Sequence, residues 1–129
     1  MKRILLYLII ILSFSGCEKK TNWTLKSQPP NLIVVDGVIT SETKTQSITL
    51  TSPVSELNAK PAPVSKSNIL ISDEDSVFHM IENPAGSGIY KSLSPFSARE
   101  GKHYSLLIFH GNQVLSAKSI MEPALLFNF

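Results

Sequence analysis

Short runs of β-type residues, separated by turn residues, fill the chain from residue 31 to residue 120. Valine, isoleucine and threonine recur in these runs, whereas glycine, proline, asparagine and aspartate recur between them. The two groups favour strands and turns respectively. The runs are Leu32–Thr40, Gln46–Thr51, Ser67–Ser72, Ser76–Glu82, Ile89–Ser92, His103–Phe109 and Gln113–Ile120. Seven short strands at this spacing predict an all-β domain, with a β-sandwich as the first choice and a small barrel as the second.

Two of these runs predict how their side chains are placed. Leu32–Thr40 is apolar at both odd and even positions, which is typical of a strand that is covered on both faces. Gly37 inside it predicts a bulge or a close backbone approach. Gln46–Thr51 alternates between polar and apolar residues, so Ile48 and Leu50 are expected to point inward.

The first sixteen residues have the form of a secretory signal peptide. A basic tripeptide is followed by nine unbroken apolar residues, Ile4–Leu12, and small residues precede Cys17. The end of the segment resembles the lipobox of bacterial lipoproteins, with Phe14 where that family prefers leucine. The resemblance implies that the Cys17 thiol is acylated and that Cys17 becomes the new N-terminus. We therefore expect an outer-membrane lipoprotein in the cell envelope, attached to the membrane by its lipid.

Two other fates for this segment are weighed against lipidation. A transmembrane anchor needs about 18 apolar residues, and the stretch from Ile4 to Phe14 has only eleven. Ordinary cleavage would leave a free thiol, and a lone exported cysteine then needs a partner chain. Lipidation is the preferred interpretation, because two or more acyl chains hold a protein stably at a membrane.

Removing residues 1–16 leaves 113 residues with ten basic and ten acidic side chains. This balance, without a basic cluster, gives no electrostatic reason to expect nucleic acid as a partner. Residues 17–30 carry the lipidated N-terminus and a polar stretch ending in two prolines, which predicts a flexible linker. The β-domain is expected over residues 31–123, followed by an apolar tail over residues 124–129.

The three histidines do not predict a metal site. His103 and His110 are seven positions apart, so in one regular strand they lie on opposite faces. His79 is expected to be a half-buried imidazole in the middle of a strand. Structural zinc requires four clustered nitrogen or sulfur ligands, so no metal and no other cofactor is expected.

One acidic cluster and one modification motif remain. Asp73-Glu74-Asp75 lacks the glycine and further ligands of an EF-hand, so a solvated hairpin turn is preferred over a calcium site. Asp75-Ser76-Val77 resembles the short acceptor for O-glycans on exported proteins, which makes Ser76 a possible glycosylation site. No Gly-x-Ser-x-Gly elbow and no phosphate-binding loop occurs, so we do not expect an enzyme.

An ordered set of segments is similar to a known family. The segments are Leu32–Thr40, Ser47–Thr51, Pro61–Val64, Ile69–Asp73, Gly88–Tyr90 and Gly101–Leu106. Together they resemble an uncharacterised bacterial lipoprotein family, domain of unknown function 4249, from Asn31 to Pro123. The resemblance implies an immunoglobulin-like or prealbumin-like sandwich and supplies no catalytic residues. It covers the N-terminal part of such proteins, so the chain is expected to be truncated.

The functional expectation is therefore a non-enzymatic, membrane-anchored interaction domain. It is expected to assist an outer-membrane transporter or to bind an extracellular ligand, on the periplasmic face rather than the cell surface. The candidate surface joins the loops Ser52–Val64 and Phe96–Gly101, to which Leu93, Phe96 and Tyr90 add apolar area unless they belong to the core. Two alternatives stay open: a remnant of a lipid-anchored hydrolase, and a truncated gene product without independent function. The oligomeric state is also left open.

Overall fold

The computed structural model describes residues 31–56 and 58–123, and its regular elements are all β-strands. They are β1 (Val34–Gly37), β2 (Ser47–Thr51), β3 (Asn68–Ser72), β4 (Val77–Glu82), β5 (Ile89–Ser92), β6 (His103–His110) and β7 (Gln113–Ile120). The predicted all-β domain of seven strands is confirmed, and each predicted run except the first matches a strand to within one residue at either end. In this part of the chain no helix is long and apolar enough to cross a membrane. The predicted signal peptide, linker and C-terminal tail lie outside the described residues.

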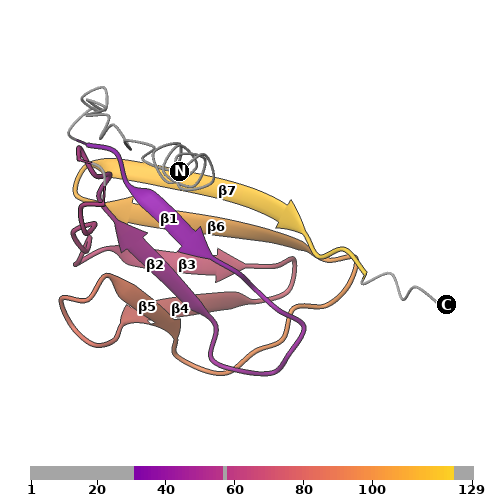
Figure 1. Ribbon diagram of the computed structural model, residues 1–129. Helices are drawn as coiled ribbons and strands as arrows, with labels where there is room; N and C mark the ends of the chain where they lie inside the picture. The colour runs from indigo at the N-terminus through magenta and orange to yellow at the C-terminus, as the bar shows by residue number, and fades with distance from the viewer. Residues whose placement is uncertain (1–30, 57, 124–129) are drawn as a thin grey trace, which may run out of the picture.

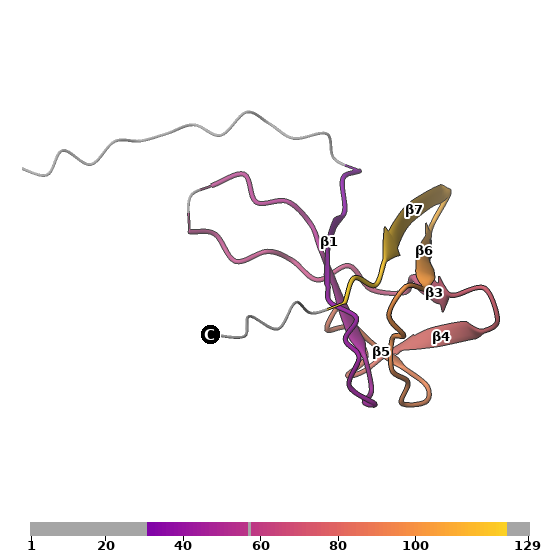
Figure 2. The same cartoon turned by 90° about the vertical axis from the view of Figure 1, so that its right-hand side faces the viewer.

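Hydrogen bonds join all seven strands into one curled sheet in the order β1-β2-β5-β4-β3-β6-β7. Every neighbouring pair is antiparallel. The curl brings the two ends of the sheet round to face each other, as Figures 1 and 2 show. In Figure 2, β1 and β5 lie on one side of the core and β3, β6 and β7 on the other. One continuous sheet thus supplies both faces of the sandwich-like core.

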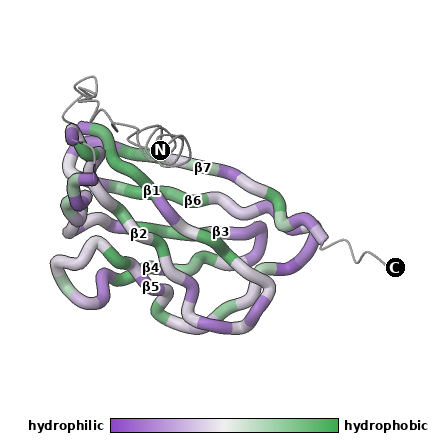
Figure 3. Tube along the Cα trace, in the orientation of Figure 1, coloured by the Kyte–Doolittle hydropathy of each residue, from purple (hydrophilic) through white to green (hydrophobic). Residues whose placement is uncertain are grey.

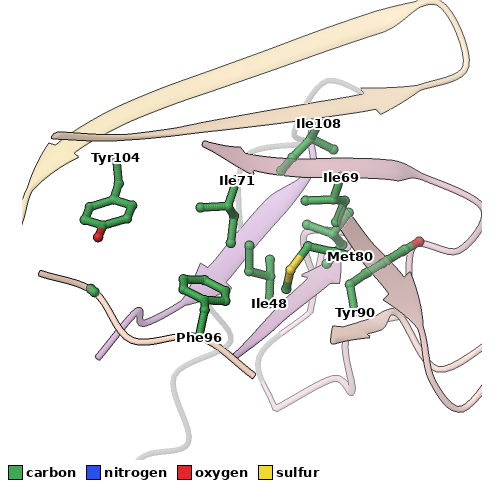
Figure 4. Close-up of a cluster of buried hydrophobic side chains, with 10 residues drawn as sticks. Ile48, Ile69, Ile71, Met80, Tyr90, Phe96, Tyr104 and Ile108 are labelled. Carbon is green, nitrogen blue, oxygen red and sulfur yellow. The ribbon is translucent and has the colours of Figure 1, made fainter. Parts of the chain in front are cut away.

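The core lies on the concave face of the curled sheet. As predicted, the alternating run of β2 points Ile48 and Leu50 inward, and both are almost fully buried. Phe78 and Phe96 stack with their ring centroids 3.9 Å apart, which fixes the loop after β5 against β4. Figure 4 shows most of this cluster. Its buried members are Ile48, Leu50, Ile69, Ile71, Met80, Tyr90, Phe96, Ala98, Tyr104 and Ile108.

A buried glutamine closes one end of the core. The Gln46 side chain is 2% exposed, and its Nε2 donates to the carbonyl oxygens of Phe96 at 2.9 Å and Glu42 at 3.1 Å. Its Oε1 accepts the backbone N–H of Thr40 at 3.3 Å. A buried amide must be hydrogen-bonded to be tolerated. Gln46 therefore ties the loop before β2 to the loop after β5.

The prediction for the first strand is wrong in one respect. β1 was expected to be covered on both faces, but all four of its residues are exposed. The reason is its place at the edge of the sheet, where it pairs only with β2 among the described strands. The close approach predicted at Gly37 is confirmed, because a Cβ there would lie 2.9 Å from Cγ1 of Ile48.

Candidate functional site

The convex face of β3, β4, β6 and β7 carries large apolar side chains that are exposed or, at Leu70 and Leu107, half-buried. Leu93, next to β4, is 62% exposed, and Val114 on β7 is 64% exposed. We call this surface the outer apolar face. Its members are Leu70, Val77, Ile81, Leu93, Leu107, Phe109 and Val114. Figure 3 shows the hydrophobic residues along β3, β6 and the beginning of β7.

The register of the sheet makes the outer apolar face continuous. Leu70 of β3 pairs with Leu107 of β6, and Phe109 two positions further pairs with Val114 of β7. Residues directly opposite in an antiparallel pair lie on the same face and in contact range. Exposed apolar patches of this kind mark sites of protein or membrane interaction. The sequence analysis did not identify this face, because alternation along the strands does not tell which face stays uncovered.

His79 also lies on this convex face. It pairs with Leu70 and is exposed, so the expectation of a half-buried imidazole is wrong. The physical reason is that β3 and β4 are covered on their concave side only, whereas His79 points away from the core. His79 therefore places a polar side chain between Leu70 and the other members of the outer apolar face.

The two loops predicted as one surface lie at opposite ends of β2, so that prediction is wrong. The loop after β2 is held by the Ser52 N–H, which donates to the Ala62 carbonyl at 2.9 Å. The other loop runs beside the beginning of β2, where the Phe96 N–H donates to the Lys44 carbonyl at 3.0 Å. Phe96 and Tyr90 belong to the buried core, and Leu93 alone stays exposed. The error arose because sequence distance does not tell at which end of a sheet a loop lies.

The remaining histidines are separated as expected. β6 runs without interruption from His103 to His110, and His103 is exposed on the convex side. His110 lies on the other face, where its Nδ1 is 2.9 Å from Oγ of Ser67. Within residues 31–56 and 58–123, no three histidine, cysteine, aspartate or glutamate side chains are grouped to hold a metal ion.

The acidic cluster forms the turn between β3 and β4, as predicted. Oδ1 of Asp73 accepts the backbone N–H groups of Asp75 at 2.9 Å and Ser76 at 2.7 Å. The Lys102 ammonium lies 2.8 Å from Asp75 and 2.9 Å from Glu74. The hydrogen bond from Lys102 lowers the pKa of Asp75. Ser76, the predicted glycosylation site, is exposed at the end of this turn.

Cys17, the predicted acylation site, lies outside the described residues. Comparison with known proteins adds one finding about the chain as a whole. The sequence model of one family, described as a domain of unknown function (DUF4249), matches residues 18–126. No curated protein and no solved structure matches the chain.

Proposed function

The chain belongs to the DUF4249 family, and from that premise we propose that it is a lipid-anchored protein of the bacterial outer membrane. Its β-domain binds another envelope protein, such as an outer-membrane transporter, and catalyses no reaction. The cysteine after the apolar N-terminal segment supports the anchor. Residues 18–30 can reach at most about 43 Å at ~3.3 Å per residue, which is enough to hold a domain beside the bilayer.

The outer apolar face is the observation that carries the proposed binding function. Val77, Leu93 and Val114 are each more than half exposed. Complete burial of such a side chain contributes about 1.5–3 kcal/mol, and association costs about 4–15 kcal/mol in lost freedom of motion. The three side chains together can therefore offset the lower part of that cost, and the neighbouring Leu70, Leu107 and Phe109 add to it.

The anchor is tested by metabolic labelling with radioactive palmitate. We expect label in the full chain and none in Cys17→Ala, which should also leave the membrane fraction. If Cys17→Ala remains membrane-bound to the same extent, the anchor proposal fails.

The binding function is tested by chemical crosslinking in intact cells, followed by mass spectrometry. We expect a crosslinked envelope protein whose yield falls in Leu93→Glu and Val114→Glu, because a charge on the outer apolar face must be desolvated on binding. Val34→Glu is the matched control, since Val34 is 46% exposed on β1, away from this face. An equal fall in all three variants, or no crosslinked partner, contradicts the proposal.

A further inference from the structure

The two edges of the sheet run in the same direction. The strand order places β1 at one end and β7 at the other, and each neighbouring pair between them is antiparallel. Direction therefore alternates across seven strands, so the first and the last point the same way. A single strand placed between them would be antiparallel to both.

A groove lies between these two edges. It has a volume of about 420 Å³, and its walls are residues 37–39, at the end of β1 and just beyond it, and residues 117–121, at the end of β7 and just beyond it. Its floor includes Ala98, Tyr104 and Leu106 from the core side. Figure 2 shows β1 and β7 at the two facing ends of the curled sheet.

Both edges of the sheet carry residues that face the core yet remain partly exposed. Val35 pairs with Leu50 and shares its inward face, but Val35 is 38% exposed whereas Leu50 is fully buried. On the other edge, Ala117 lines the groove, pairs with Leu106 and is also exposed. Inward-facing residues at both edges thus lack the cover that a further strand would provide.

A hydrogen bond links the two edges at one end of the sheet. At the beginning of the two strands, the Gln113 side-chain amide donates to the Asn31 carbonyl at 3.1 Å. The groove residues lie toward the opposite ends of β1 and β7. The groove therefore lies beyond this link, and an extended segment would enter it from the end where β7 stops.

From these observations we infer that the groove binds an extended segment of a partner polypeptide, which adds as an antiparallel strand between β1 and β7. Main-chain hydrogen bonds to both edges give affinity in this mode of recognition, and alternate side chains give specificity. The inward side chains of the segment are apolar, to meet Leu106, Ala98 and Ile39. This inference deepens the proposed binding function, on which it rests.

The charge of Lys118 indicates which residue type the bound segment carries on its outward side. Lys118 is the single charged residue among the groove walls, and it pairs with Ser105 on the convex side. In the part of the chain that the structure describes, the carboxylates found in ion pairs are those of Glu42, Glu74 and Asp75, and none of them pairs with Lys118. The segment therefore carries a carboxylate opposite Lys118.

A synthetic peptide tests this inference on the full chain in detergent. The probe is a fluorescent nonapeptide in which valine alternates with threonine and one threonine is replaced by glutamate; the control peptide has proline at the central position. We expect saturable binding of the probe by fluorescence anisotropy and none of the control, because proline removes a main-chain donor. Hydrogen exchange should slow at amides of both β1 and β7.

Three variants locate the binding. Ala117→Glu places a charge on the inward wall and should weaken binding at least tenfold, whereas Ser116→Glu, which points outward on the same strand, should not. Lys118→Glu should weaken binding of the probe about two- to fivefold and favour a peptide with lysine instead of glutamate, as expected for one cross-strand charge pair. Urea unfolding of each variant checks that the fold is kept.

Several results would overturn the inference. These are no probe binding, slowed exchange at one edge only, or equal weakening by Ala117→Glu and Ser116→Glu. A chain ending at Pro123 that binds the probe at least tenfold more tightly would assign the groove to residues 124–129 instead. A dimer in sedimentation equilibrium that the probe dissociates would assign it to a second copy.

The proposed binding function fails separately, when no partner is crosslinked in cells. If partner crosslinking is unchanged in Ala117→Glu, the groove inference alone fails.

Discussion

The centre and the edges of the sheet are made of similar residues but are covered differently. In β2 and β3, buried and less buried positions alternate strictly, whereas β1 is exposed throughout and β7 almost throughout. The pair Val35 and Leu50 shows the contrast directly, since the two are opposite one another on one face and only Leu50 is buried. Apolar β-type residues therefore indicate a strand, but the position of that strand in the sheet decides whether they stabilise the fold or remain available for binding.

The largest expected effect tests this pair. Leu50→Ala should lower the free energy of unfolding by about 2–5 kcal/mol, because it leaves a cavity at a fully buried site. Val35→Ala should lower it by less than about 1 kcal/mol, because its side chain is already partly in water. Urea denaturation of both variants measures the difference. Equal losses would mean that the edge is as well packed as the centre.

Two glycines allow the same comparison between a packed and an open position of the backbone. Gly86 and Gly88 both have positive φ, so alanine costs about 1–2 kcal/mol at either position. At Gly88 a Cβ would also lie 2.5 Å from the Leu50 carbonyl oxygen, whereas at Gly86 it would meet nothing within 4 Å. Gly88→Ala should therefore destabilise the domain by about 1–3 kcal/mol more than Gly86→Ala in thermal unfolding. A smaller loss at Gly88 would show that β2 and β5 separate easily.

The smallest effects concern two carboxylates. The Gly88 N–H donates to Glu82 at 2.9 Å and lowers the pKa of that carboxyl. The Lys44 ammonium, in an exposed pair, lowers the pKa of Glu42. By NMR titration both pKa values should lie below the ordinary value. High salt should raise the pKa of Glu42 back toward its ordinary value and leave the pKa of Glu82 low. The reason is that ions screen an exposed ion pair more than a backbone hydrogen bond.

The lowered pKa of Glu82 also predicts the direction in which stability changes with pH. A carboxyl with a lowered pKa in the folded state contributes stability above its unfolded pKa, and the contribution is lost as pH falls through the folded value. The urea midpoint of the natural chain should therefore fall more steeply on acidification than that of Glu82→Gln. Parallel curves would contradict the role of the Gly88 hydrogen bond.

The local sequence pattern was sufficient to predict the strands. It failed to predict the burial of residues and the placement of loops wherever these depend on neighbours far along the chain. The alternation of polar and apolar residues around Ile48 and Leu50 was enough to predict their burial, because this pattern requires only that one face of the strand is covered. The apolar character of β1 did not reveal that β1 forms an edge, since the strand order arises from pairings across the whole domain. The outer apolar face and the groove were missed for the same reason. His79 and the pair of loops were misplaced because their surroundings come from other strands.

The free backbone of β1 and β7 has a consequence for how copies of this protein behave together. The two edges are different, so a contact between β1 of one molecule and β7 of another is of the head-to-tail kind, which forms a ring or an open filament according to the rotation between the copies. Unprotected edges of this sort are templates for fibre growth. A segment bound in the groove, as inferred above, covers the ends of both edges at once and thereby also blocks polymerisation.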